Sequence, residues 1–261
     1  MNHQTKKHFG QNFLKDTNLL KKIVREADIK NKNVLEIGPG QGGLTKELVL
    51  VAKDVVAYEI DLSLKKFLDS LENDYDNLSI IYQDFLKSEL KLNEETHLVA
   101  NVPYYITTPI LFTFLETKNL KSATMMIQKE VAERLIAEPS TKAYNALSVL
   151  VQYYTTVKKV MDVDRRLFYP VPKVDSIVVR LIKRIEREIP SNDEPLFIEF
   201  IKAAFKQKRK TLINNLFEFE KISKDKIKDQ LKRAGLNEKV RAEALALQHW
   251  IALFEVWKND R

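Results

Sequence analysis

A stretch near the middle of the chain carries the residue types needed to hold an amine. The run 97–100 (HLVA) reads as a short buried strand, and Asn101-Val102-Pro103-Tyr104 follows it directly. An asparagine oxygen and a neighbouring backbone carbonyl can accept two N–H bonds from one amine, and proline keeps such a carbonyl in place because its ring fixes φ. Tyrosine adds a flat face on which a base can stack. The alternative is a turn that only ends the strand.

A glycine loop and two acidic residues at the ends of three other expected strands indicate a site for a nucleoside. The glycine loop 38–43 (GPGQGG) joins a strand to a helix, where glycines let the backbone turn sharply and approach a ligand. Glu59 ends the next strand and can accept both hydroxyls of an adenosine ribose. Asp84 follows the strand after that and can accept the exocyclic amine of an adenine. We therefore expect an adenosine-containing cofactor at the carboxyl ends of the strands.

Two cofactors fit this pattern, a nicotinamide dinucleotide and S-adenosylmethionine, because the loop satisfies G-x-G-x-x-G. The Asn101 motif favours the second. The exocyclic amine of adenine is a poor nucleophile, since its lone pair is delocalised, and it must become more tetrahedral to accept a methyl group. Two acceptors aimed at its N–H bonds would stabilise that state. We expect the Asn101 oxygen and the carbonyl of Val102 or Pro103 to be these acceptors, and Tyr104 to stack on an extruded base.

Six motifs occur in the same order as in the ribosomal RNA adenine dimethyltransferases, and the chain resembles this family. They are 11–14 (QNFL), 38–45 (GPGQGGLT), 59–61 (EID), Asp84, 101–104 (NVPY) and 168–176 (FYPVPKVDS). The KsgA type of this family modifies two adjacent adenosines in the 3′-terminal hairpin of small-subunit rRNA. The Erm type modifies large-subunit rRNA and confers macrolide resistance. The resemblance covers nearly the whole chain, and 205–216 (FKQKRKTLINNL), 241–243 (RAE) and the GPG of the loop resemble the KsgA type.

The resemblance implies a role for each motif. The implied cofactor-binding residues are Asn12, Leu14, Gly38, Glu59, Asp84 and Asn101. Among them, Asn12 and Leu14 would cover the cofactor as part of an N-terminal lid, and Gly38 would line its methionine portion. Glu59 would bind the ribose and Asp84 the adenine amine. The implied catalytic residues are Asn101, Pro103 and Tyr104, and Phe168 would stack on the face of the target base opposite Tyr104.

The chain departs from the family pattern at three positions. Val102 stands where Leu or Ile is usual, and Ser140 and Asn145 replace frequent glycines. Asn145 can adopt a left-handed backbone, whereas Ser140 leaves the path of its loop open.

Strands and helices alternate from residue 19 to about 184. Expected helices lie at 19–27, 44–51, 64–71, 110–115 and 131–137, and expected strands at 34–37, 55–58, 78–82, 97–101 and 124–127. This alternation predicts an α/β fold with a mostly parallel sheet covered on both faces. Two β-rich runs, 152–163 and 174–182, have no helix between them and predict an antiparallel last strand. With the resemblance, the sheet is expected to be that of a Rossmann-like S-adenosylmethionine-dependent methyltransferase.

The polar segment 186–195 (EREIPSNDEP) reads as a linker between two domains. We expect residues 1–185 to form the S-adenosylmethionine-binding catalytic domain and 195–261 to form a small all-helical RNA-binding domain. One buried stripe is expected from residues that recur at helical spacing, namely Leu247, Trp250, Ile251, Phe254 and Trp257.

The net charge of +7 suits an acidic partner, although an ordinary lysine-rich surface is the alternative. The cations gather around Phe205, just before Phe168, and ahead of the expected lid, where Lys6 and Lys7 stand. The expected RNA-binding residues are Lys206, Lys208, Arg209, Lys210, Arg165 and Arg166, with Lys202 beside the first group. Cations that flank a base-reading motif favour contact with phosphates.

Composition narrows the class further. The chain has no cysteine and four scattered histidines, so we expect neither a thiolate nucleophile nor a metal site. It has no secretory h-region and no apolar run of about 18 residues. We expect a cytoplasmic monomer that acts without a membrane or a metal ion.

The predicted function is dimethylation of the N6 amines of two adjacent adenosines in the 3′-terminal hairpin loop of 16S rRNA, within the 30S subunit, with a role in small-subunit biogenesis. Three alternatives stay open. An Erm-type enzyme would act on 23S rRNA. A ribosome-assembly or transcription factor would keep the fold only to bind RNA, although Gly38, Glu59 and Asn101 are intact. An NAD dehydrogenase would leave the Asn101 motif unexplained.

Overall fold

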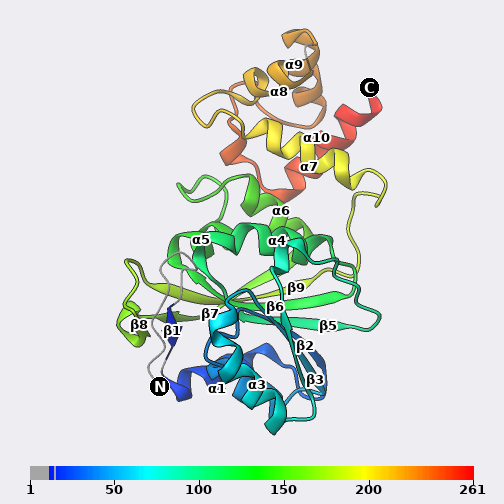
Figure 1. Ribbon diagram of the computed structural model, residues 1–261. Helices are drawn as coiled ribbons and strands as arrows, with labels where there is room; N and C mark the ends of the chain where they lie inside the picture. The colour runs from blue at the N-terminus through cyan, green and yellow to red at the C-terminus, as the bar shows by residue number, and fades with distance from the viewer. Residues whose placement is uncertain (1–11, 15, 221) are drawn as a thin grey trace. The chain divides into compact units, whose positions relative to one another are not determined.

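The computed structural model describes residues 12–14, 16–220 and 222–261 (Figure 1). Backbone contacts divide the chain into two compact units. The first comprises Met1–Ala132 and Val157–Lys183, and the second comprises Glu133–Thr156 and Arg184–Arg261. The sequence places its boundary between residues 185 and 195. The segment 133–156 therefore groups with the C-terminal residues, although it precedes the expected linker.

A seven-stranded sheet forms the centre of the first unit in the part that the structure describes. Its strands are β2 (Asn33–Ile37), β3 (Asp54–Glu59), β4 (Leu78–Tyr82), β5 (Thr96–Asn101), β6 (Leu120–Gln128), β7 (Thr155–Val163) and β9 (Ser176–Lys183), in the spatial order β4-β3-β2-β5-β6-β9-β7. Neighbours from β4 to β6 are parallel, whereas β9 is antiparallel to β6. The expected mostly parallel sheet with an antiparallel last strand is confirmed.

Helices cover both faces of this sheet. They are α1 (Thr17–Ala27), α2 (Gly43–Val49), α3 (Lys65–Asp74) and α4 (Thr107–Glu116). The first unit also contains the short 3-10 helices η2 (Leu62–Leu64), η3 (Phe85–Lys87), η4 (Tyr104–Ile106) and η5 (Arg165–Leu167), and α5 (Lys129–Leu135) begins in the first unit and ends in the second. Figure 1 shows α1 and α3 on one face and α4 on the other. Strands covered on both faces are buried along their length and mostly apolar, as in β2, where four of five residues are buried and three of these are apolar.

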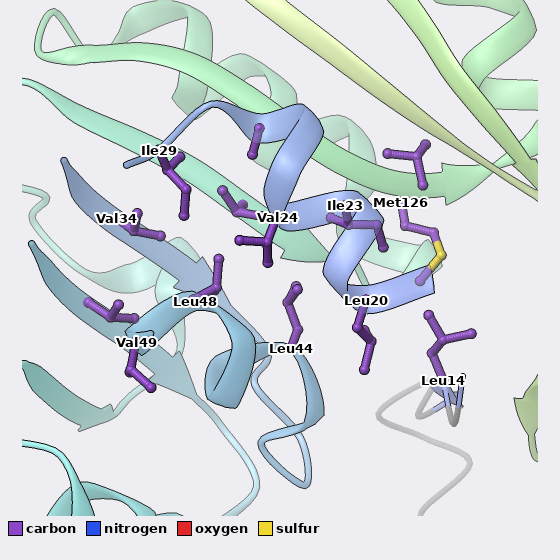
Figure 2. Packing of buried hydrophobic residues seen from close by; sticks show 14 of the residues in the cluster. Leu14, Leu20, Ile23, Val24, Ile29, Val34, Leu44, Leu48, Val49 and Met126 are labelled. Atoms are coloured by element: carbon purple, nitrogen blue, oxygen red, sulfur yellow. The ribbon is translucent and has the colours of Figure 1, made fainter. Parts of the chain in front are cut away.

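The core between α1 and α2 anchors the N-terminal segment. Helix α1 begins after Asp16, whose carboxylate caps the first turn. Its buried residues recur every three or four positions and form one face, Leu20, Ile23, Val24 and Ala27. Figure 2 shows this face packed near Leu44 and Leu48 of α2, with Leu14 close to Leu20. Burial of Leu14 in this cluster fixes the segment 12–14 to the body of the unit.

A two-stranded sheet joins the N-terminal segment to a late part of the chain. Strand β1 (Phe13–Leu14) pairs antiparallel with β8 (Phe168–Tyr169), and Leu14 lies opposite Phe168. Phe168 is only 3% exposed and belongs to the same apolar cluster as Leu14. In this state Phe168 is therefore a core residue.

The second unit is helical, as expected for the C-terminal part. Its elements are α6 (Ala146–Tyr154), α7 (Glu194–Ala204), α8 (Leu212–Glu220), α9 (Lys224–Arg233), η6 (Ala242–Ala244) and α10 (Leu247–Asn259). Aromatic rings fill its core, with the Phe200 and Trp257 centroids 4.8 Å apart. Of the expected stripe, Leu247 is half-buried and the other four residues are buried. None of the helices in the described ranges is long and apolar enough to cross a membrane.

Helix α6 corrects the strand expected to begin at residue 152. The Asn145 Oδ1 accepts the N–H of Leu147 at 2.9 Å, while Ser148 Oγ accepts the N–H of Asn145 at 3.0 Å. This reciprocal cap starts a helix through the β-branched and aromatic residues up to Tyr154, so β7 begins only after it. Asn145 therefore has an extended backbone, and Ser140 is the residue with a left-handed φ of +66°.

Candidate active site

A cavity of about 360 Å³ opens at the carboxyl ends of the parallel strands in the first unit. The strand order reverses between β2 and β5, and open α/β sheets bind their ligands at such a point. Counted along the chain, the strands of the sheet read 3-2-1-4-5-7-6, which departs from the 3-2-1-4-5-6 order common in dinucleotide-binding sheets. The predicted site residues that line this cavity are Asn12, Leu14, Gly38, Glu59, Asp84, Asn101, Pro103 and Tyr104.

The glycine loop needs glycine both for its backbone and for space. Gly38 and Gly40 have φ values of +70° and +60°, which residues with a Cβ rarely adopt. A Cβ on Gly40 would lie 2.8 Å from the Phe13 ring, so the N-terminal segment packs directly on the loop. The Gly40 N–H donates to Glu59 Oε2 at 3.1 Å. This bond ties the loop to the end of β3.

Glu59 is held in the cavity wall by two backbone N–H groups. Besides the bond from Gly40, its Oε1 accepts the N–H of Asp61 at 2.8 Å. The side chain is 5% exposed, and this burial raises the pKa of Glu59 above its usual range, although the backbone hydrogen bonds oppose the effect. Each carboxylate oxygen keeps a further lone pair. The group can therefore accept two more hydroxyl donors, as a ribose diol would provide.

A second carboxyl group, Glu36, lines the same cavity, and the sequence reasoning assigns it no role. It is 1% exposed, and its Oε2 has no hydrogen-bond partner among the described residues. Burial raises the pKa of Glu36 to about 8, and the Glu59 carboxylate contributes in the same direction. The nearby Thr45 hydroxyl lowers the value, although it lies outside full hydrogen-bond geometry. In the sequence, the feature that indicates this buried carboxyl group is a single acidic residue within an otherwise apolar strand, 34–37 (VLEI).

Substituting Glu36 by Gln should remove a pH dependence of folding stability. A carboxyl group whose pKa is raised by folding stabilises the fold below the unfolded value of 4.5 and loses that contribution as pH rises through about 8. The free energy of unfolding of the wild type should fall relative to that of the variant by up to about 1.4 kcal/mol per pH unit in this window. Urea unfolding at about pH 5, 6.5 and 8 measures the difference. A difference that stays constant with pH would contradict the assignment.

The Asn101 amide is oriented by the N-terminal segment. Its Nδ2 donates to the backbone carbonyl of Asn12 at 3.1 Å, a contact between residues 89 positions apart. Because a carbonyl can only accept, the amide nitrogen must face Asn12, and the amide oxygen is left for another donor. The side chain is half-buried and lines the cavity. The expected lid and the Asn101 motif are thus joined directly.

The backbone after Asn101 distinguishes the two carbonyls that the sequence left open. The Pro103 carbonyl accepts the N–H of Ile106 at 3.1 Å in η4. The Val102 carbonyl has no hydrogen-bond partner within the described chain. The Val102 N–H donates to the Met126 carbonyl at 3.2 Å, and the side chain is 1% exposed. This part of the backbone is therefore fixed, with the Val102 carbonyl still able to accept.

Two tyrosines follow on the same wall. Tyr104 is half-buried, and its hydroxyl shares a hydrogen bond with Ser176 Oγ at 2.8 Å, which holds the ring in place. Burial raises the pKa of Tyr104. Tyr105 also lines the cavity and is 56% exposed. Tyr105 is thus a cavity residue to which the sequence reasoning assigned no function.

Of the predicted residues Asp84 and Phe168, one lines the cavity and the other does not. Asp84 lines the cavity, and its Oδ1 accepts the N–H of Leu86 at 3.1 Å, which caps η3. Phe168 is buried in the β1–β8 pair and does not line the cavity as described. Stacking of Phe168 on a target base stays a prediction, and it requires this strand pair to move.

The expected RNA-binding arginines of the first unit are engaged with neighbouring residues. Arg165 Nη1 donates to the Lys173 carbonyl at 2.9 Å. Arg166 binds the Asp164 carboxylate through Nε and Nη2, at 2.9 and 2.6 Å. These contacts fix the two guanidinium groups at the surface and use part of their donor capacity.

The expected RNA-binding lysines lie in the second unit. Lys208, Arg209 and Lys210 are exposed, and none of them forms an ion pair with another described residue. Lys206 Nζ lies 4.0 Å from the Glu218 carboxylate, a distance at which an exposed pair contributes little. Residues 6, 7 and 11 of the expected lid region lie outside the described residues.

Comparison with known proteins decides the family. The family model described as ribosomal RNA adenine dimethylase matches residues 2–259. The chain belongs to this family. It is a methyltransferase whose cofactor is S-adenosylmethionine and whose substrate class is ribosomal RNA.

Individual relatives extend over nearly the whole chain. "Ribosomal RNA small subunit methyltransferase A" of Onion yellows phytoplasma strain OY-M is 49% identical over 98% of this chain and 97% of its own length. The crystal structure of a dimethyladenosine transferase from Plasmodium falciparum is 30% identical, with a TM-score of 0.81, over 95% of this chain and 98% of that one. The crystal structure of the 23S rRNA methyltransferase ErmE is 31% identical, with a TM-score of 0.76, over 95% and 100%.

The residues of the cavity fit the cofactor of this dimethylase family. Glu59 is fixed by backbone bonds and keeps lone pairs for a diol. The loop at Gly38 and Gly40 lines the cavity in a backbone conformation that favours glycine, with φ values of +70° and +60°. Asp84 contributes a carboxylate on the wall after β4. These groups match the hydroxyls and the amine of an adenosine.

Proposed function

We propose that the chain dimethylates the N6 amines of two adjacent adenosines in the 3′-terminal hairpin loop of 16S rRNA within the 30S subunit. It acts in the cytoplasm as a monomer, without a metal ion, and takes part in small-subunit biogenesis. The 49% identity to a small subunit methyltransferase A supports this substrate. The observation that carries the chemistry is the Asn101 amide, whose nitrogen is occupied by Asn12.

Residues around the cavity would hold the cofactor. Glu59 accepts the ribose hydroxyls, Asp84 accepts the adenine amine, and the backbone at Gly38 lines the methionine portion. Asn12 and Leu14 cover the cofactor, because their segment is anchored in the core and bonded to Asn101. When bound, S-adenosylmethionine supplies an electrophilic methyl group.

The target amine is held by two acceptors at the end of β5. We assign these to Asn101 Oδ1 and the Val102 carbonyl, because the Pro103 carbonyl already accepts from Ile106. Each acceptor takes one N–H of the amine, which draws the nitrogen toward a tetrahedral geometry and directs its lone pair to the methyl group. The interactions strengthen as positive charge develops on the nitrogen, so they favour the transition state over the ground state.

Stacking of the target base and loss of the amine proton require few further protein groups. The Tyr104 ring, fixed through its hydroxyl to Ser176, offers a face on which the extruded adenine stacks. A methylated, positively charged amine is acidic enough to lose a proton to water. The mechanism therefore requires no side chain as a strong general base.

A second candidate activity is methylation of 23S rRNA. It is favoured by the ErmE structure, which shares 31% identity and a TM-score of 0.76 with this chain. The higher identity to the small subunit methyltransferase favours the first candidate. Transfer of labelled methyl groups from S-adenosylmethionine to immature 30S particles and to protein-free 23S rRNA separates the two. Methylation of 23S rRNA alone would overturn the proposal.

Replacing Lys208 and Arg209 together by alanine should weaken rRNA binding and reduce its salt dependence. Both side chains are exposed and have no ion pair among the described residues, so both are available to phosphates. Each phosphate contact contributes about 0.7 to 0.9 to the slope of log K against log salt, so the slope should fall by about 1 to 2. Filter binding across a KCl series measures it. Lys21→Ala/Lys66→Ala removes the same charge from exposed sites in the first unit, and an equal effect in both variants would contradict the assignment.

A further inference from the structure

The second unit contains a cavity of its own, for which the proposed methyl transfer has no use. It measures about 210 Å³ and lies among the residues before α6, the end of α7, the turn 205–210, α8 and η6. Residues from four separate stretches of the chain converge on it, including Tyr144, Phe205, Lys208, Asn215 and Glu243. All of them belong to the same compact unit.

Two aromatic rings give the cavity a rigid wall. The Phe205 ring is half-buried, 5.4 Å from the Trp250 ring and 6.2 Å from the Tyr144 ring between centroids. Tyr144 is 1% exposed, and its hydroxyl donates to the Leu245 carbonyl at 2.8 Å. Both rings are thus held in place by the protein itself. A fixed and partly exposed ring suits a planar ligand that stacks on it.

The turn that carries the cations is also fixed. Asn215 is 2% exposed, and its Oδ1 accepts the N–H of Gln207 at 3.0 Å while its Nδ2 donates to the Gln207 carbonyl at 3.2 Å. The Lys210 N–H donates to the same carbonyl at 3.1 Å. Lys208 and Lys210 line the cavity and are exposed, and neither pairs with a carboxylate in the described part of the chain. Lys208 Nζ donates to the Lys142 carbonyl at 3.1 Å, which keeps the ammonium group beside the cavity.

We propose that this cavity binds one unstacked nucleotide of the ribosomal RNA, other than the target adenosine. The base lies against Phe205, and the flanking phosphates lie on Lys208 and Lys210. The inference rests on the proposed rRNA substrate. The lysines without acidic partners are complementary to a polyanion, and the aromatic wall is complementary to a planar ring. The volume of about 210 Å³ is below the roughly 300–1,000 Å³ of pockets for drug-sized ligands, so it suits a single base.

Such a contact would add recognition beyond the target base. Proteins read RNA mainly through single-stranded nucleotides, whose bases can be splayed out and stacked on aromatic side chains. Phosphate contacts alone position the nucleic acid without distinguishing an unpaired nucleotide from a paired one. A cavity that accepts a base next to fixed lysines would select RNA with an unpaired nucleotide at this place.

Binding of a labelled pentanucleotide tests the proposal. The probes are 5′-fluorescein-UUGUU and the same strand with an abasic third position, which keeps every phosphate. The 261-residue protein should bind the intact probe about tenfold more tightly than the abasic probe. Phe205→Leu removes the ring, and Ala146→Leu enlarges a side chain that lines the cavity. Each substitution should reduce this preference to less than about twofold. Lys208→Ala/Lys210→Ala should weaken both probes equally.

Controls place the effect in this cavity. Phe217→Leu should keep the preference, because this ring on α8 is exposed and lies outside the lining of the cavity. Equal affinity of the wild type for both probes, a preference that survives the two cavity variants, or its loss in Phe217→Leu would each overturn the proposal. Thermal unfolding checks that each variant is folded, and Ala146→Leu serves if Phe205→Leu is not. Methyl transfer to rRNA is measured separately. If the protein methylates rRNA but shows no base preference, only the assignment of this cavity is contradicted. If it does not methylate rRNA, the proposed function is contradicted.

Discussion

Replacing Asn101 by alanine is expected to lower the rate of methyl transfer by about 10³-fold, while the Kd for S-adenosylmethionine changes by less than about tenfold. In the proposed mechanism the amide oxygen is one of two acceptors for the target amine, and its contribution grows as charge develops on the nitrogen. The proposed cofactor contacts are made mainly by Glu59 and the glycine loop, whose mutual bonds the substitution leaves in place.

Single-turnover rates on rRNA and calorimetric binding of S-adenosylmethionine without rRNA measure the two quantities separately. Asn101→Asp gives a second test of the role of orientation. It keeps an acceptor but places an oxygen against the Asn12 carbonyl, where the wild type has an N–H donor at 3.1 Å. Its rate should also fall, because the group can no longer be fixed by the N-terminal segment. Asn93→Ala, at an exposed position, is the matched amide control. Turnover near that of the wild type in Asn101→Ala would contradict the mechanism.

The sequence predicts most of this site because parallel strands place their carboxyl ends at one edge. Glu59, Asp84 and Asn101 each end or follow an apolar run of strand length, and the glycine loop follows another. Once the mostly parallel sheet is inferred, these residues must lie near one another. Residue type then indicates the chemistry. The structure confirms the sheet and brings the predicted residues around one cavity.

Contacts between distant segments could not be predicted in this way. The bond from Asn101 to Asn12 spans 89 positions and depends on Leu14 packing beside α1. Phe168 was expected to face the target base, yet its pairing with Leu14 buries it. The choice between the Val102 and Pro103 carbonyls depends on the 3-10 turn at Ile106. These outcomes are set by tertiary packing, which neither periodicity nor residue type encodes.

A helix cap explains why residues 152–154, which were expected to begin a strand, belong to helix α6. Residues 146–154 (ALSVLVQYY) are rich in β-branched and aromatic types, which favour strands. The cap formed by Asn145 and Ser148 satisfies backbone N–H groups that a new helix would otherwise leave without partners. The cap and burial in the aromatic core of the second unit therefore outweigh the intrinsic preference. The Asn145-x-x-Ser148 spacing is the feature of the sequence that indicates the start of α6.

Substitution of Glu59 by Gln is expected to weaken binding of S-adenosylmethionine and S-adenosylhomocysteine by about 100-fold, or roughly 2.7 kcal/mol. Both oxygens of Glu59 accept backbone N–H groups, from Gly40 at 3.1 Å and from Asp61 at 2.8 Å. A glutamine has only one oxygen, so its amide nitrogen must face one of these donors. The variant therefore loses one bond that holds the loop or the start of η2, together with one of the acceptors proposed for the ribose.

The pH dependence gives this prediction a second readout. Burial raises the pKa of Glu59 above its usual range, so the carboxylate is lost at a higher pH than in a solvated glutamate. Hydroxyl donors bind the carboxylate better than the protonated acid, so the affinity of the wild type should fall as pH decreases through this pKa. Glu59→Gln has no such group and should show weak affinity with a flatter profile. Calorimetric titration with S-adenosylhomocysteine across the acidic range measures both effects.

The controls separate loss of the acceptor from loss of charge. Glu89→Gln removes one negative charge at an exposed position outside the cavity and should bind the cofactor like the wild type. Hydrogen exchange at the Gly40 amide tests the loop directly, because its donation to Glu59 should slow exchange in the wild type but not in Glu59→Gln. If cofactor affinity in Glu59→Gln matched that of Glu89→Gln, the ribose would have to be bound by another group. Unchanged exchange at Gly40 would mean that the backbone bond does not hold the loop, even if the affinity falls.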